Sequence, residues 1–209
     1  YAHLVALGTI ADLVPLKEEN RLLVQMGLAR MADNGAPGLE SLAQLAGISL
    51  EGIASEQVAF GLAPRMNAAG RMETAEVAAV LLLSDDEEEA QRLAGHLDGL
   101  NRLRRQLEEE IFAQAEQFLA QEPERLFHRV LIAWGEGWSH GVIGIVSAKL
   151  MQKYLKPCIL MTEEDGQLVG SARSIPGFSM VEAVASAGDL LTKFGGHPAA
   201  AGFSMKAEN

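Results

Sequence analysis

GGHPAAAGF at residues 195–203 follows GSARS at residues 170–174, and these two glycine-rich segments are the most informative part of the sequence. Glycine permits turns in which backbone N–H groups come close to a ligand. We therefore predict two glycine turns, one carrying His197 and the other carrying Ser171 and Arg173. Each segment alone is more often an ordinary turn, because a short motif is only a hypothesis until its surroundings agree. Together they predict a pocket for a phosphate or a nucleotide.

The residues from 125 onward alternate between strand-like and helix-like patterns. Short apolar runs predict strands at 130–134, 157–162, 167–173 and 200–205. Helices are predicted between them at 142–154 and 179–187, and residues 164–166 have the composition of a turn. This order predicts a compact α/β domain whose ligand loops lie at the ends of strands.

Residues 1–83 predict a mainly helical region divided by glycine turns. Helices are expected at 20–31, 38–46, 55–63 and 74–83, and the NGAPG segment at 34–38 predicts a loop. Near the start of the chain, Asp12 is expected to follow an apolar strand and to precede a turn at Pro15.

One long helix is predicted for residues 84–122. Ser84 and Glu87 form a capping-box pattern with acidic residues in the first turn, and Pro123 ends the helix. Apolar residues recur mostly at spacings of three and four: Leu93, Leu97, Leu100, Leu103, Leu107, Ile111 and Phe118. At 1.5 Å per residue the helix is a rod of roughly 55 Å, long enough to join two bodies and line a groove. Periodicity alone fits a helix packed along one domain equally well.

The predicted fold class is therefore α/β, with two bodies joined by a long helix. We place the boundaries at 1–83 for the first body, 84–122 for the connecting helix and 123–209 for the second body. Composition agrees, because 209 residues with 48% hydrophobic content suffice for one or two domains.

The net charge of −11 stands against a general electrostatic attraction to nucleic acid. The acidic residues are unevenly distributed along the chain. Residues 1–124 hold 9 Lys and Arg against 21 Asp and Glu, whereas residues 125–209 hold 8 against 7. Much of the excess lies at 85–89 and 108–110, where a charge run on a helix is usually a solvated face. Local basic residues would therefore have to hold any phosphate.

Two further features bear on the environment of the chain. Cys158 is the only cysteine, so it forms no internal disulfide and supplies no metal-ligand spacing. The sequence has no apolar run of the roughly 18 residues that span a bilayer and opens with no secretory leader. From these features we expect a cytoplasmic protein without a membrane partner.

Five segments resemble the RecJ family of single-strand-specific exonucleases, within the DHH phosphoesterase superfamily. GWSHGVIGIV at 137–146, GSARS at 170–174 and FGGH at 194–197 resemble its DHHA1 domain. LGTIADLVPL at 7–16 resembles its fourth catalytic motif, and PRMNAAGRM at 64–72 resembles the segment that closes its catalytic domain. The resemblance runs from residue 1 to about residue 206.

The first three motifs of the family, including the Asp-His-His triplet, are absent from the sequence. We therefore expect a fragment. The resemblance implies that residues 1–83 are the C-terminal part of a DHH catalytic domain and that residues 123–209 are a DHHA1-type nucleic-acid-binding domain.

Asp12 is the candidate catalytic and metal-binding residue. A carboxylate is a suitable ligand for Mn or Mg, the ions used in phosphodiester hydrolysis. Taken alone, an Asp before a turn is more often a cap or turn residue. The resemblance makes Asp12 a metal ligand, with a two-metal site expected only in the complete protein, because one carboxylate cannot build such a site.

The candidate substrate-binding residues form two groups. Guanidinium groups bind phosphate bidentately, so a loop at residues 64–72 is chemically suited to contact a phosphate or the DNA strand beside the scissile bond. Spacing alone favours an ordinary surface loop, but the resemblance reverses that preference because it implies that this segment adjoins the active cleft. The first group consists of Arg65, Asn67 and Arg71. The second group consists of Ser171, Arg173, Gly195, Gly196 and His197, and the resemblance assigns it to nucleic-acid contact.

The resemblance implies a metal-dependent, single-stranded-DNA-specific exonuclease that works in the 5′-to-3′ direction in DNA repair and recombination. The residues present are expected to be inactive by themselves. Two alternatives stay open: a DHH and DHHA1 phosphoesterase acting on oligonucleotides or cyclic dinucleotides, and a non-catalytic nucleic-acid-binding module.

Overall fold

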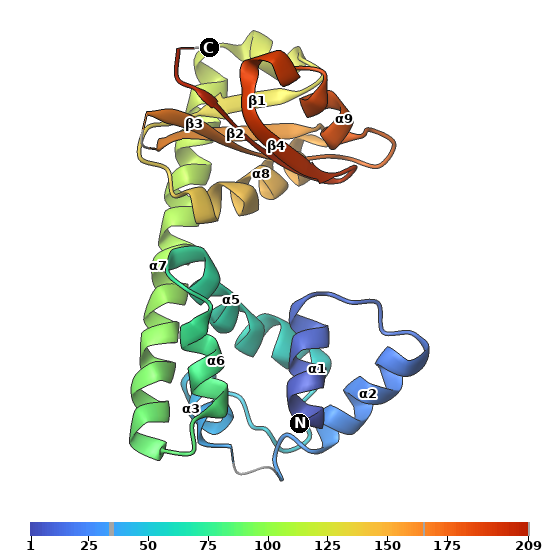
Figure 1. The fold of residues 1–209 in the computed structure, drawn as a ribbon, viewed down its shortest axis with the longest axis vertical. Helices are drawn as coiled ribbons and strands as arrows, with labels where there is room; N and C mark the ends of the chain where they lie inside the picture. Colours follow the sequence, from blue (N-terminus) through green and yellow to red (C-terminus); the bar gives the residue numbers. More distant parts are fainter. Residues whose placement is uncertain (34–35, 165, 209) are drawn as a thin grey trace. The chain divides into compact units, whose positions relative to one another are not determined.

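The computed structural model describes residues 1–33, 36–164 and 166–208. Within it the chain forms two compact units, Tyr1–Arg104 and Arg105–Asn209, called here the N-terminal and C-terminal units (Figure 1). The loop predicted at 34–38 and the turn predicted at 164–166 fall partly on residues 34, 35 and 165, which lie outside the described residues.

The N-terminal unit is helical, as predicted. Its elements are α1 (Ala2–Ala11), α2 (Glu18–Ala29), α3 (Pro37–Ala46), α4 (Ser55–Gln57), a π-helix (Val58–Leu62), α5 (Ala63–Met72), α6 (Glu76–Leu83) and the first part of α7 (Glu87–Gln121). Its core brings together buried side chains from most of these helices, among them Leu7, Leu42, Leu62, Leu81 and Leu97. Burial of these apolar side chains is the main force that holds the helices together.

Helix α1 corrects the prediction that Asp12 follows a strand. The buried residues of α1 are His3, Ala6, Leu7 and Ile10, and their spacing of three and four is that of one helix face. The apolar run was too short and too uniform to distinguish a strand from a helix. Asp12 is therefore the C-cap of a helix.

The segment 64–72 is also helical, which corrects the prediction of a loop. Pro64 directly follows the π-helix Val58–Leu62, and its missing N–H falls where the hydrogen-bonding pattern changes from π to α. Because the segment 64–72 is a helix, the helix geometry fixes the directions in which its side chains project.

Helix α7 runs close to its predicted span of 84–122. Asp86 caps it, since its Oδ1 accepts a hydrogen bond of 2.7 Å from the Glu89 N–H; Ser84, expected as the cap, instead donates its hydroxyl to Glu89 at 2.9 Å. Beyond the N-terminal unit, α7 continues with buried Ile111 and Leu119. Most of the apolar residues in the predicted periodicity are buried or half-buried, whereas Leu103 is exposed.

The C-terminal unit is the predicted α/β domain. After the end of α7 come a 3₁₀ turn (Pro123–Phe127), β1 (Leu131–Trp134), α8 (His140–Tyr154), β2 (Cys158–Glu164), β3 (Gln167–Arg173), α9 (Met180–Ala185), a 3₁₀ turn (Gly188–Leu190), β4 (Leu191–His197) and β5 (Ala200–Lys206). The strand order is β1-β2-β3-β5-β4, with β1 and β2 parallel and the other neighbours antiparallel.

Helices α8 and α9 cover opposite faces of the sheet (Figure 1). On the α9 face, Met180 and Val184 pack against Ala172, Ala201 and Phe203. Helix α8 packs mainly on β2 and β3 from the other side. Because successive side chains of a strand alternate between faces, Ser171 and Arg173 lie on the α8 face.

Strand β4 corrects the prediction of a glycine turn at residues 195–197. Gly195 pairs with Gly202, Gly196 with Ala201 and His197 with Ala200. Glycine is depleted in strands, so composition pointed to a turn where the ladder continues. The glycine turn predicted at GSARS is likewise the end of β3, in agreement with the strand predicted at 167–173.

Helix α7 is tied to α8 by polar contacts within the C-terminal unit. Glu108 is buried and pairs with Lys149, and Glu116 pairs with Lys153. Trp138 Nε1 donates to Gln114 at 2.7 Å. The acidic run at 108–110, expected to be fully solvated, therefore contributes to packing through Glu108. Among the described helices, none has the length and apolar character that a membrane span requires.

We expect Leu97→Ala to lower the free energy of unfolding by about 2–5 kcal/mol, since it leaves a cavity in the core of the N-terminal unit. Leu103→Ala on the same helix is the matched control. Leu103 is 44% exposed, and its truncation should cost less than about 1 kcal/mol. Urea unfolding measures both; equal losses would contradict the assigned face of α7.

Candidate functional site

A cavity of about 780 Å³ in the N-terminal unit brings together three of the four candidate residues found there. Asp12 enters it from the end of α1, and Asn67 and Arg71 enter it from α5. Asn67 and Arg71 are four residues apart and so lie on one face of their helix. The cavity therefore offers a carboxylate, an amide and a guanidinium to one ligand.

The end of α1 holds Asp12 in place. Leu13 N–H donates to the Ile10 carbonyl at 3.1 Å and Val14 N–H donates to the Thr9 carbonyl at 3.1 Å, the pattern of a Schellman motif. Leu13 takes the left-handed conformation (φ 55°) that usually requires glycine. Asp12 thus adds its charge to the negative end of a helix, where a bound cation is favoured.

Asp12 fits the requirements of one oxygen ligand for a divalent metal. Elsewhere in the described residues, no three His, Cys, Asp or Glu side chains gather as a metal-binding group. Any further ligands of a two-metal site would have to come from residues other than those described.

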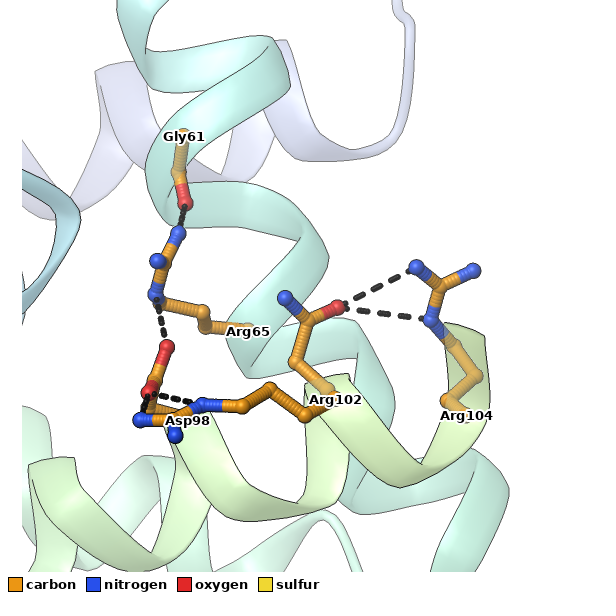
Figure 2. Close-up of polar contacts among 6 residues, drawn as sticks. Gly61, Arg65, Asp98, Arg102 and Arg104 are labelled. Atoms are coloured by element: carbon orange, nitrogen blue, oxygen red, sulfur yellow. Dashed lines mark hydrogen bonds and ion pairs between the residues drawn. The ribbon is translucent and has the colours of Figure 1, made fainter. Parts of the chain in front are cut away.

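Arg65 does not line this cavity and instead binds Asp98 of α7 (Figure 2). Its Nε donates to Asp98 Oδ1 at 2.9 Å, and its Nη1 donates to the Gly61 carbonyl of the π-helix at 2.6 Å. Its side chain is only 17% exposed. The structure therefore separates Arg65 from the cavity that contains Asn67 and Arg71.

Asp98 is the centre of this polar cluster. Its Oδ2 accepts hydrogen bonds from Arg102, one of 2.8 Å from Nε and a second from Nη2. Burial by itself raises the pKa of the Asp98 carboxyl, but the hydrogen bond from Arg102 and the charge of Arg65 outweigh burial, so its pKa is lowered. Asp98 therefore stays ionised and links α5 to α7.

The sequence analysis missed this cluster. Asp98 lies 33 residues from Arg65, and nothing local indicates that the two meet. A signal did exist on α7, where Asp98, Asn101 and Arg102 lie three and four residues apart on one face. Arg104 extends this set, with its Nε and Nη2 donating to Asn101 Oδ1 at 3.3 and 3.2 Å (Figure 2).

The second group of candidate residues lies on one face of the sheet in the C-terminal unit. Arg173 Nη1 donates to Ser171 Oγ at 3.1 Å and to the Ala172 carbonyl at 2.9 Å. Directly opposed residues on neighbouring antiparallel strands point to the same face. Arg173, Ala200 and His197 therefore form one row across three strands.

A second row runs beside the first and consists of Ser171, Gly202 and Gly195. Both glycines are exposed, and a side chain built at Gly195 would meet no atom within 4 Å. The backbone of β4 and β5 is thus accessible on the α8 face, beside a hydroxyl and a guanidinium. A guanidinium and a hydroxyl can donate hydrogen bonds to a phosphate, and the open backbone leaves room for the neighbouring sugar.

Gly196 lies between these rows and has a steric reason to be glycine. Its φ is 152°, and an added Cβ would overlap the Ala200 carbonyl oxygen. This constraint comes from the β4–β5 hairpin. Ligand contact at Gly196 remains a prediction.

The α9 face of the same sheet has a different character. A cavity of about 260 Å³ there is lined by apolar side chains, including Ile132, Met161 and Val184. It offers no charged group to a phosphate. Polar and apolar surfaces are therefore separated between the two faces of the sheet.

Residues 127–209 match the DHHA1 domain family. Over 208 residues the chain is 42% identical to the single-stranded-DNA-specific exonuclease RecJ of Bacillus subtilis (strain 168), covering 99% of the chain and 26% of that relative. Crystal structures of RecJ from Thermus thermophilus, one in complex with Mg²⁺ and one with Mn²⁺, each match 100% of the chain with a TM-score of 0.86 and 41% identity. The match covers 32% and 30% of those two chains, so the chain spans about a third of their length or less.

We expect Asp98→Asn to destabilise the N-terminal unit by about 3 kcal/mol at neutral pH, because it leaves Arg65 without its charge partner. The folded-state pKa of Asp98 is lowered, so its contribution is fully present above the unfolded pKa of about 4 and is lost as the pH falls below it. Urea unfolding at neutral and acidic pH should show that the difference in the free energy of unfolding between wild type and variant becomes smaller at low pH. Glu122→Gln, at an exposed ion pair with Arg125, is the control and should cost less than about 1 kcal/mol. A pH-independent difference for Asp98→Asn would contradict this assignment.

Proposed function

We propose, from the premise that the chain belongs to the RecJ family and contains a DHHA1 domain, that its complete protein degrades single-stranded DNA. The proposed reaction is hydrolysis of phosphodiester bonds in the 5′-to-3′ direction, in the service of DNA repair and recombination. The names of the relatives and of the solved structures support an exonuclease specific for single-stranded DNA; the direction and the roles in repair and recombination are our proposal. We assign residues 1–83 to the C-terminal part of the catalytic domain, 84–122 to a connecting helix and 123–209 to strand binding.

The observation that carries the proposal is the row of Arg173, Ala200 and His197 beside the row of Ser171 and the two glycines. A guanidinium and a hydroxyl next to accessible backbone hold a phosphate without reading a base. This agrees with an enzyme that acts on single strands of any sequence.

In the N-terminal unit we assign Asp12 the role of one metal ligand, with Mn²⁺ or Mg²⁺ as the cofactor. The metal would polarise the phosphoryl oxygen and activate water for attack. Asn67 and Arg71 line the same cavity and would orient the phosphate beside it. Arg65 would act on that site through α5 rather than by touching the strand, since its guanidinium is held by Asp98 and Gly61.

A second candidate function is favoured by one observation. Asp12 is the one carboxylate that lines the cavity among the described residues. Residues 1–209 alone would then bind nucleic acid without cleaving it.

We expect Arg173→Ala to weaken binding of a single-stranded oligonucleotide to residues 1–209 by about 1.5–3 kcal/mol, the range for a charge-assisted hydrogen bond. The loss should be the same for every base sequence. Lys206→Ala is the control, because Lys206 pairs with Gln167 at the opposite end of β3. Fluorescence anisotropy measures the affinities; equal effects of the two substitutions would mean that only overall charge matters.

We expect residues 1–209 with Mn²⁺ to leave labelled single-stranded DNA intact, because one carboxylate does not hold two metal ions. In the complete protein, Asp12→Ala should abolish metal-dependent cleavage while the affinity for single strands changes little. Cleavage by residues 1–209 that Asp12→Ala abolishes would contradict the proposed division of the site.

A further inference from the structure

Helix α8 passes over β3 at a glycine. A side chain built at Gly144 would place its Cβ 2.8 Å from Ser171 Oγ and 2.9 Å from Arg173 Nη2. Contacts below 3.0 Å essentially never occur for real Cβ atoms, so any residue larger than glycine at this position must displace one of these two groups. Because Gly144 has no side chain, the end of the Arg173 side chain occupies the space beside it.

The other side of the Arg173 guanidinium is held by β3 itself. Nη1 donates to Ser171 Oγ at 3.1 Å and to the Ala172 carbonyl at 2.9 Å. The guanidinium therefore lies in a slot formed by the backbone of α8 at Gly144 and by two oxygen atoms of β3. Ser171 and Arg173 are both partly buried, and the hydrogen bond between them favours one orientation of the two side chains.

We propose that Gly144 is a positioning residue that sets the orientation of the Arg173 guanidinium and the Ser171 hydroxyl toward a phosphate of the bound strand. This inference rests on the proposed function, since it requires that Ser171 and Arg173 bind phosphate. Gly144 itself touches no substrate. It acts by leaving room for the group that does.

The atoms that face Gly144 distinguish this role from ordinary helix packing. At Gly27 and Gly38, an added Cβ would overlap backbone carbonyl oxygens, so a larger residue there must move the backbone. At Gly144 it would meet the ends of two polar side chains, which can rotate away. A methyl group at position 144 should therefore be accommodated by displacement of Arg173 and leave the fold intact.

Helix propensity makes the expected result sharper. Alanine is a better helix former than glycine, and position 144 lies inside α8. Gly144→Ala should thus keep or raise the melting temperature and still weaken binding. A residue with only a packing role would show the opposite result, with lower stability and unchanged binding per folded molecule.

The experiment measures binding of a 5′-phosphorylated single-stranded oligonucleotide to wild type, Gly144→Ala, Arg173→Ala and the double variant, together with each melting temperature. We expect Gly144→Ala to weaken binding about tenfold, equivalent to about 1.4 kcal/mol. The double variant should bind no more weakly than Arg173→Ala, because both changes act on one group. Gly99→Ala on α7 is the matched control, since an added Cβ there meets no atom within 4 Å, and it should bind like wild type.

The outcomes separate the positioning role of Gly144 from the phosphate site itself. If Arg173→Ala weakens binding and Gly144→Ala does not, the positioning role is wrong and the proposed function stands. If Arg173→Ala itself has no effect, the proposed phosphate site is wrong. If Gly144→Ala lowers the melting temperature, the double variant should recover part of the loss, because truncation of Arg173 removes one of the two close contacts. A loss of stability that is equally large in the double variant would overturn the inference.

Discussion

The uninterrupted helix α7 is the constraint on which both units depend. Leu97 and Leu100 belong to the core of the N-terminal unit, and Ile111 and Leu119 are buried further along the same helix. The acidic residues of α7 are part of the same arrangement, because Glu108 pairs with Lys149 of α8.

The net charge of −11 does not favour the proposed polyanionic ligand, so the distribution of the charges matters. Part of the acid on α7 is neutralised by lysines of α8 and by the arginines around Asp98. The candidate strand-binding surface lies on the α8 face of the sheet, where Ser171 and Arg173 adjoin accessible glycine backbone. Local geometry, rather than the global field, would then provide the affinity. Such a surface favours contact with phosphates over contact with bases.

The sequence predicted the fold best where one signal extended over many residues. The span of α7 followed from repeated apolar spacing, and the α/β order of the second unit followed from alternating runs. Prediction failed where a local preference was overruled by tertiary pairing. Gly195 and His197 belong to β4 because they pair with β5. The strand at 200–205 was predicted, but no local pattern shows that residues 195–197 pair with it. The meeting of Arg65 with Asp98 could not be predicted either, because it depends on how α5 packs against α7.

The central claim is that a phosphate-bearing strand binds the α8 face of the C-terminal sheet. The most direct test is a titration of ¹⁵N-labelled residues 1–209 with a 5′-phosphorylated single-stranded oligonucleotide, followed by amide chemical shifts. We predict that the largest changes occur at Gly144, Ser171, Arg173 and Gly195. Changes confined to the apolar cavity on the α9 face, around Val184, would contradict this claim, as would the absence of any change at saturating oligonucleotide.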